Sequence, residues 1–122
     1  MNGIDYLADT NALIYLLSGN SCMEPFLTSR LGVSVISEME LLSFSNISEE
    51  EDRLIRDYLN HCFLLPLDDS IKERTIALRK KYRIKLPDAI IAATAVEGNL
   101  PLLSANQRFE KIAELSFQLL MT

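Results

Sequence analysis

Residues 4–18 read IDYLADTNALIYLLS, an apolar run that ends at an acid and is followed by an amphipathic segment. The run over residues 4–8 predicts a buried strand, and residues 11–18 predict a helix that Gly19-Asn20-Ser21 ends. Asp9 stands between the two elements. Two roles are open to its carboxylate, because it can cap the helix that follows or belong to a functional site at the end of the strand.

The rest of the chain continues this alternation of strands and helices. Further strands are expected over residues 33–36, 63–67, 102–103 and 116–120. Helices are expected over residues 23–30, over residues 37–44, after Ser48, after residues 68–70 and from Pro87 to Gly98-Asn99. This alternation predicts an α/β fold in which a central, mostly parallel sheet carries helices on both faces. At 122 residues the chain suits one domain, residues 1–122, with a core of its own.

Three of the expected helices have a recognisable core side. Ser48 and Glu51 form a capping box, and the helix after it presents one apolar face, made of Leu54, Ile55, Tyr58, Leu59 and Cys62. The next helix presents Ile71, Leu78 and Tyr82 to the core. Residues 89–96 are apolar nearly all round, which predicts a helix buried on most sides.

The composition excludes several classes of protein. With 48% apolar residues the chain is not expected to be disordered, and its formal charge of −5 argues against a general nucleic-acid coat protein. The N-terminus lacks the basic flank of a signal peptide, and no apolar run approaches the ~20 residues of a membrane helix. We therefore expect a cytoplasmic protein without a membrane partner.

The cysteines and the single histidine do not form a recognisable site. Cys22 and Cys62 are too far apart in sequence for a metal or redox motif. His61 and Cys62 are adjacent, so their side chains are not expected to face each other as a catalytic pair. One histidine and one cysteine also fall short of the four ligands of a zinc site. These residues are expected to be surface or packing residues.

Three acids and one amide fall at predicted junctions between strands and helices, namely Asp9, Glu40, Asp88 and Asn106. The last three have local alternatives as well. Glu40 has capping-box spacing to Ser37, Asp88 suits the first turn of a helix, and Asn106 suits a turn. If they meet at the carboxyl edge of one sheet, acids without lysine partners repel each other and need a cation. Mg²⁺ or Mn²⁺ fits such oxygen ligands best.

Residues 72–85 hold seven basic residues and one acid, Glu73, which gives seven minus one, or +6, in a chain that is acidic overall. Two interpretations are open. The segment is either a solvated helix face or a patch that steers phosphates past the acids. The candidates for steering are Arg79, Lys80, Lys81, Arg83 and Lys85.

Four segments resemble the motifs of PIN-domain nucleases. Residues 7–14 (LADTNALI) resemble the opening motif, and residues 34–42 (SVISEMELL) resemble the second, which places the family's acid at Glu40. Residues 84–95 (IKLPDAIIAATA) closely resemble the third motif of the VapC-like toxins. Residues 102–109 (LLSANQRF) resemble the closing motif. The resemblance covers nearly the whole chain and implies a PIN-like three-layer sandwich.

The resemblance implies a metal-dependent endoribonuclease that is the toxin of a type II toxin–antitoxin pair and cleaves RNA phosphodiesters with a metal-activated water. Its catalytic acids would be Asp9, Glu40 and Asp88, which hold Mg²⁺ or Mn²⁺ together with Asn106. Ser104 matches a hydroxyl residue common in the closing motif, and Asn11 is a second supporting candidate. The chain departs from the four-acid pattern, because Asn106 and Arg108 stand where acids are often found.

The resemblance also implies two protein partners. One is an antitoxin whose segment lies in an apolar groove, with Leu13, Leu16, Leu17, Leu42 and Phe44 as candidate contacts, although core packing is the alternative for most of these. The other is a second copy of the chain, which would pair through an apolar helix face around residues 11–17.

Three other functions are alternatives to the nuclease. A PIN-like module that binds RNA or a partner without cutting stays open because of Asn106. A phosphoacceptor receiver domain requires paired acids after the first strand, and only Asp9 is there. A phosphohydrolase of the Asp-x-Asp type requires a second aspartate where Asn11 stands.

Overall fold

The computed structural model describes residues 3–122, so the first two residues of the predicted domain lie outside the described part. Its centre is a five-stranded sheet in the order β3-β2-β1-β4-β5, and every neighbouring pair is parallel. The strands are β1 (Tyr6–Ala8), β2 (Leu31–Ser34), β3 (Phe63–Leu65), β4 (Leu102–Ser104) and β5 (Phe117–Leu119).

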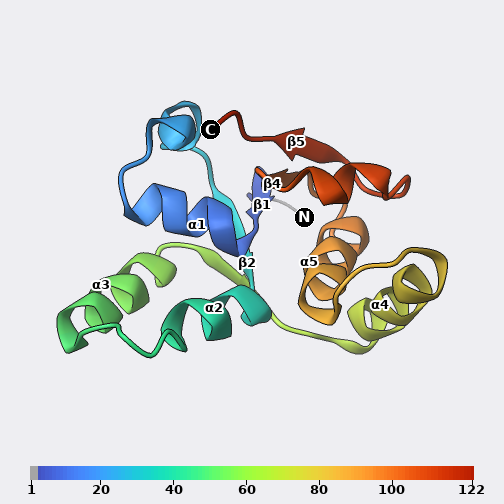
Figure 1. Cartoon of the computed structure of the whole chain (residues 1–122), viewed down its shortest axis with the longest axis horizontal. Helices are drawn as coiled ribbons and strands as arrows, with labels where there is room; N and C mark the ends of the chain where they lie inside the picture. The colour runs from blue at the N-terminus through green and yellow to red at the C-terminus, as the bar shows by residue number, and fades with distance from the viewer. Residues whose placement is uncertain (1–2) are drawn as a thin grey trace.

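Helices cover both faces of the sheet (Figure 1). The α-helices are α1 (Thr10–Leu17), α2 (Val35–Leu42), α3 (Glu49–Leu59), α4 (Asp69–Lys81) and α5 (Leu86–Glu97). Two 3-10 helices, η1 (Ser21–Phe26) and η2 (Gln107–Lys111), complete the connections. None of the helices in residues 3–122 has the length and apolar character needed to cross a bilayer.

Alternating strand residues separate two cores. Leu7 and Leu102 pack on the face that α4 and α5 cover. Their neighbours Ala8 and Leu103 pack on the face that α1, α2 and α3 cover. Because consecutive side chains in a strand point to opposite faces, β1 and β4 each contribute to both cores. The predicted three-layer α/β fold with a parallel central sheet is confirmed.

Helix α5 is the most deeply buried helix, as its apolar sequence predicts. Every residue from Ala89 to Ala95 is buried. Thr94 is accommodated because its hydroxyl donates to the Ile90 carbonyl at 2.7 Å. The helix ends at Gly98, and Asn99 takes the left-handed conformation that follows, with φ of 52°. The C-cap predicted at Gly98-Asn99 is confirmed, with asparagine in the position that glycine usually fills.

The second strand and its helix begin earlier than the sequence predicted. The strand was expected over residues 33–36 and the helix from Ser37, but β2 ends at Ser34 and α2 begins at Val35. Ser34 is the N-cap, because its hydroxyl accepts from the Ile36 N–H at 3.1 Å. Ser37 therefore lies inside the helix and is fully buried.

Helix α3 confirms one prediction and corrects another. The capping box of Ser48 and Glu51 is present in both directions, at 3.0 and 3.1 Å. Leu54 was expected in the core but is 59% exposed, while Leu59 is buried. The core-facing stripe is therefore narrower than the sequence suggested and runs along Ile55, Tyr58 and Leu59.

Candidate functional site

The topology places a crevice at the carboxyl ends of β1 and β4. After β1 the chain builds β2 and β3 on one side of it, and then crosses to β4 on the other side. Strand order therefore reverses between β1 and β4, which is where open parallel sheets bind ligands. Asp9 directly follows β1, and Ser104 is the last residue of β4.

Asp9 is buried and held by both carboxylate oxygens. It is only 5% exposed. One oxygen accepts from the Ala12 N–H at 2.8 Å and so caps α1. The other accepts from the Ser104 hydroxyl across the switch point. The two roles considered for Asp9 are therefore not exclusive, since capping fixes the carboxylate at the edge of the sheet.

Glu40 is held by a short chain of hydroxyl groups. Thr10 Oγ1 donates to Glu40 Oε1 at 2.6 Å and lies 2.9 Å from Ser37 Oγ. Thr10 has one hydroxyl proton and a carboxylate only accepts, so Ser37 completes the chain by donating to Thr10. The capping-box alternative for Glu40 is wrong, because Ser34 rather than Ser37 caps the helix.

Asn106 caps the 3-10 helix that follows it. Its side-chain oxygen accepts from the Arg108 N–H at 3.0 Å, and its own N–H donates to the Ser104 hydroxyl oxygen at 2.9 Å. Ser104 thus joins Asp9 to Asn106. The turn role considered for Asn106 is present, and its side chain still faces the crevice.

These side chains surround one hollow, which we call the carboxylate pocket, of about 410 Å³. It brings together five of the predicted site residues from four separate segments. Its lining is Asp9, Thr10, Asn11, Ile14, Glu40, Ser43, Phe44, Asp88, Ile91 and Asn106. Of the predicted groove residues, Phe44 lies in this lining and is 54% exposed, whereas Leu13 is buried in the core.

The acids in this pocket repel one another. Burial raises the pKa of Asp9, and the charges of Asp88 and Glu40 raise it further, while the hydrogen bonds from Ser104 and Ala12 oppose the shift. Burial also raises the pKa of Asp88, and Glu40 adds to the rise, while Lys85 and Arg108 oppose it. The charges of Asp88 and Glu40 therefore make the ionisation of Asp9 harder, and the charge of Glu40 does the same to Asp88.

The donor set suits a hard divalent cation in kind. It offers carboxylate and amide oxygens, with no histidine or cysteine in the lining. Among residues 3–122, however, no three His, Cys, Asp or Glu side chains are gathered closely enough to hold a metal ion as they stand. The residues that could hold one are Asp9, Glu40, Asp88 and Asn106, which line the same pocket.

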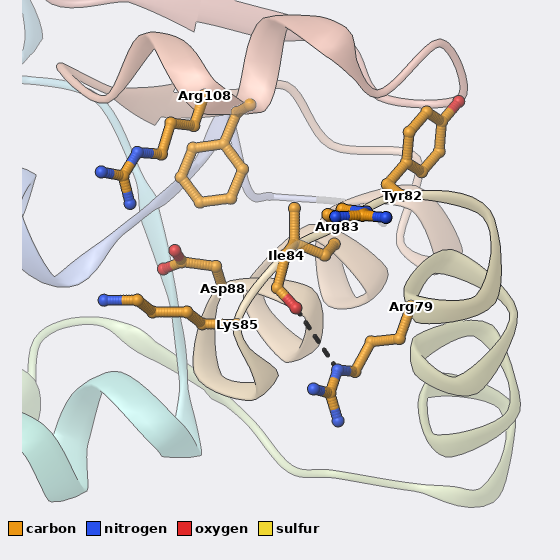
Figure 2. A pocket seen from close by; sticks show the side chains of 8 residues that line it. Arg79, Tyr82, Arg83, Ile84, Lys85, Asp88 and Arg108 are labelled. Carbon is orange, nitrogen blue, oxygen red and sulfur yellow. Dashed lines mark hydrogen bonds between the residues drawn. The ribbon is translucent and has the colours of Figure 1, made fainter.

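A second hollow of about 550 Å³ adjoins the first, and Asp88 lines both. We call it the basic pocket, and its lining is Arg79, Tyr82, Arg83, Ile84, Lys85, Asp88, Arg108 and Phe109. Figure 2 shows Lys85 and Arg108 beside Asp88, with Arg79 at the opposite side. Two of the predicted steering residues are elsewhere. Lys80 does not line the pocket, and Lys81 pairs with Glu114 at 3.2 Å.

Sequence reasoning missed two residues that line the pockets, Thr10 and Arg108, and one buried residue behind them, Ser37. From the sequence, Thr10 had no predicted role in the site, Ser37 was expected only at the start of a helix, and Arg108 was only a departure from an acidic pattern. No local signal identifies the contacts of Thr10 with Ser37 and Glu40, which span 27 and 30 positions. The sequence did carry a signal for Arg108, because an arginine two positions after Asn106 brings positive charge to the predicted acidic edge of the sheet.

Comparison with known proteins gives a consistent family and fold. The model of the PIN domain family matches residues 6–115. No curated protein matches the sequence. A chain of a toxin–antitoxin complex from Klebsiella pneumoniae is 33% identical, with a TM-score of 0.80 over 91% of this chain and 95% of that one.

Two further structures extend the comparison. A chain of VapBC-1 from nontypeable Haemophilus influenzae is 25% identical, with a TM-score of 0.82 over 98% of this chain and 100% of that one. A chain of DNA-bound VapBC from Salmonella typhimurium is 23% identical, with a TM-score of 0.85 over 97% of this chain and 99% of that one, and this likeness concerns the fold alone. The PIN-like fold expected from the four motifs is confirmed.

Proposed function

The chain belongs to the PIN-domain family, and from this membership and the carboxylate pocket we propose that it is a Mg²⁺- or Mn²⁺-dependent endoribonuclease and the toxin of a toxin–antitoxin pair. The observation that carries the proposal is the gathering of Asp9, Glu40 and Asp88 around one pocket at the switch point of a parallel sheet. Nucleases of this family generally use divalent metals, and the oxygen donors here suit them.

In the proposed reaction the cation would be held by Asp9 and Asp88, together with Glu40 and Asn106. A bound Mg²⁺ or Mn²⁺ would supply an acidified water and charge neutralisation at the scissile phosphodiester. The Ser104 hydroxyl and the Ala12 N–H keep Asp9 in one orientation.

Thr10 contributes by positioning Glu40. The hydrogen bond from its hydroxyl fixes one carboxylate oxygen and leaves the other free to accept a proton from water. No side chain has to act as a nucleophile, which agrees with a lining that holds no histidine, cysteine or lysine. The reaction class is hydrolysis of an RNA phosphodiester.

The test is cleavage of labelled RNA by antitoxin-free protein in Mg²⁺, in Mn²⁺ and in EDTA. We expect cleavage that requires metal and is abolished by Asp9→Asn. Asp57→Asn makes the same chemical change at an exposed helix position and should cut like the wild type. Wild-type turnover by Asp9→Asn would contradict the assignment.

A second candidate, a PIN-like module that binds RNA or a partner without cutting, is favoured by one specific observation. The Asn106 side-chain oxygen is already used to cap η2, so the site has three acids and an amide with reduced capacity as a ligand. No cleavage of transfer, ribosomal or messenger RNA by well-folded, antitoxin-free protein would favour this candidate.

The proposed antitoxin partner has support from the relatives and from the surface. The Klebsiella relative comes from a toxin–antitoxin complex, and the apolar side chains of Leu17, Met39 and Phe44 are exposed on or just after α1 and α2. Coexpression with the product of the neighbouring gene should give a complex that does not cut RNA. Cleavage by that complex at the rate of the free protein would contradict an inhibitory partner.

We also propose a homodimer through the α1 face around residues 11–17, where Leu17 is exposed. Light scattering at high protein concentration should give a dimer mass. A monomer mass under those conditions would contradict this part of the proposal.

A further inference from the structure

We propose that the basic pocket is a subsite for one nucleotide of the RNA strand next to the bond that is cut, because unpaired cations and an apolar wall surround a nucleotide-sized hollow that shares Asp88 with the carboxylate pocket. The inference rests on the proposed function in taking RNA as the ligand. It goes further by naming where the strand lies, which residues hold it and which nearby basic residues do not.

Apart from Lys80, the basic residues of residues 72–85, together with Arg108, fall into two groups. Three of them have acidic partners, because Lys72 pairs with Asp69, Arg74 with Glu97 and Lys81 with Glu114. Within residues 3–122, the four cations that line the basic pocket have no carboxylate at salt-bridge distance: Arg79, Arg83, Lys85 and Arg108. Charges left unpaired around one hollow are suited to an anionic ligand.

The pocket also has a fixed apolar wall. Phe109 is nearly fully buried, and Ile84 and Tyr82 are half-buried beside it. The Tyr82 ring is held in place because its hydroxyl donates to Glu114 at 2.7 Å and accepts from the Ala113 N–H at 3.1 Å. A base or ribose can rest against such a wall while the phosphate meets the arginines. A hollow of about 550 Å³ has room for one nucleotide.

The two pockets share Asp88 in their linings, which places the subsite beside the carboxylates. An RNA phosphate approaching Asp9, Glu40 and Asp88 alone meets three negative charges. Lys85 and Arg108 lie beside Asp88 and oppose that repulsion (Figure 2). A nucleotide seated in the basic pocket would place the next phosphodiester of the strand at the carboxylates. The subsite would thus set which bond is presented for cleavage.

The test measures RNA binding rather than cleavage. A short fluorescein-labelled single-stranded RNA is titrated, in EDTA, with Asp9→Asn protein carrying Arg83→Ala, Arg108→Ala or Lys80→Ala. Lys80→Ala is the matched control, since Lys80 is exposed on α4, next to Arg79, but does not line the pocket. Thermal unfolding of each variant confirms that it is folded.

We expect Arg83→Ala and Arg108→Ala each to weaken binding roughly fivefold to tenfold and to lower the slope of log K against log salt by about one. Lys80→Ala should change the affinity by less than about twofold. Equal losses for all three variants would overturn the subsite, because binding would then follow total charge. Unchanged binding in Arg83→Ala and Arg108→Ala would overturn it as well.

The outcome is separable from that of the proposed function. Metal-dependent cleavage by wild type, together with wild-type binding by Arg83→Ala and Arg108→Ala, would leave the nuclease standing and remove the subsite. Loss of binding in these two variants, in a protein that never cuts RNA, would keep the subsite and remove the nuclease. Tighter binding of polyglutamate than of RNA would show that the pocket takes an acidic peptide, which would also overturn the proposal.

Discussion

The carboxylate pocket and the basic pocket meet at Asp88 but are built in opposite ways. In the carboxylate pocket, Asp9 is buried and accepts hydrogen bonds through both carboxylate oxygens, and Glu40 accepts a hydrogen bond from Thr10. In the basic pocket the cations are exposed and have no acidic partners at salt-bridge distance among residues 3–122. Asp9 and Glu40 are therefore held by hydrogen bonds, whereas the cations of the basic pocket are exposed to solvent.

The difference fits two different tasks. A reaction centre gains from groups that are already oriented when the substrate arrives. A surface that guides a flexible polyanion gains from charge that acts over a distance and tolerates many strand conformations. If this division is correct, changes in one pocket should affect cleavage and changes in the other should affect binding.

The largest effect is expected from Asp88→Asn, which alters the residue shared by both pockets. If Asp88 holds the proposed cation, removing its charge should lower cleavage by ~10³-fold or more, since such charge stabilisation is worth several kcal/mol. Binding of RNA in EDTA should become tighter by about twofold to fivefold, since Lys85 and Arg108 lose a negative neighbour. Single-turnover cleavage and anisotropy titration measure the two effects. A variant that loses both cleavage and RNA binding would contradict the division between the pockets.

A smaller effect is expected from Thr10→Val, which removes a hydroxyl group at nearly constant volume. Glu40 then loses the 2.6 Å hydrogen bond that fixes one of its oxygens, and we expect kcat to fall about tenfold to a hundredfold. KM and RNA affinity should stay near the wild-type values, because Thr10 lies outside the basic pocket. Thr10→Ser keeps the hydroxyl and should restore most of kcat. An equal loss of kcat in Thr10→Ser and Thr10→Val would show that the effect comes from altered packing and not from the lost hydrogen bond.

The smallest effect concerns stability and pH in EDTA. Burial and the neighbouring acids raise the pKa of Asp9 in the folded protein. Its contribution to stability is therefore present below the pKa of the unfolded chain and is lost as pH rises through the folded pKa. Asp9→Asn keeps a good N-cap residue and should raise the free energy of unfolding by about 1 kcal/mol near neutral pH. The gain should shrink as pH falls through the raised pKa of Asp9, because the wild-type side chain then takes up a proton.

Urea unfolding of wild type and Asp9→Asn across this pH range checks the prediction. Taking the difference between the two proteins removes the opposite contributions of Asp68 and Glu114, whose pKa values hydrogen bonds lower. A variant less stable than wild type near neutral pH would mean that the hydrogen bond from Ser104 outweighs the cost of the buried charge.

The sequence predicted the backbone frame of the carboxylate pocket well. The strand before Asp9 and the buried helix after Pro87 both carry strong local signals, and the switch point follows from strand and helix alternation. The start of α2 was misplaced because Ser34 and Ser37 are equally good caps in isolation, and only the length of β2 decides between them.

Contacts between distant segments could not be read from the sequence. The series of hydrogen bonds from Ser37 through Thr10 to Glu40 depends on how α1 packs against α2. Which basic residues form salt bridges likewise depends on the positions of Glu97 and Glu114 in the folded protein. Leu54 was placed in the core because helical periodicity gives the centre of an apolar face more reliably than its edge.

Calorimetric titration of the metal-free protein with Mn²⁺ tests whether Asp9 and its neighbours form a site for a divalent cation. We expect saturable binding by wild type and by Asp57→Asn, and a loss of about tenfold or more in affinity in Asp9→Asn. Arg83→Ala should bind Mn²⁺ as the wild type does, because Arg83 lines only the basic pocket. Mn²⁺ binding that is unchanged in Asp9→Asn would contradict the account.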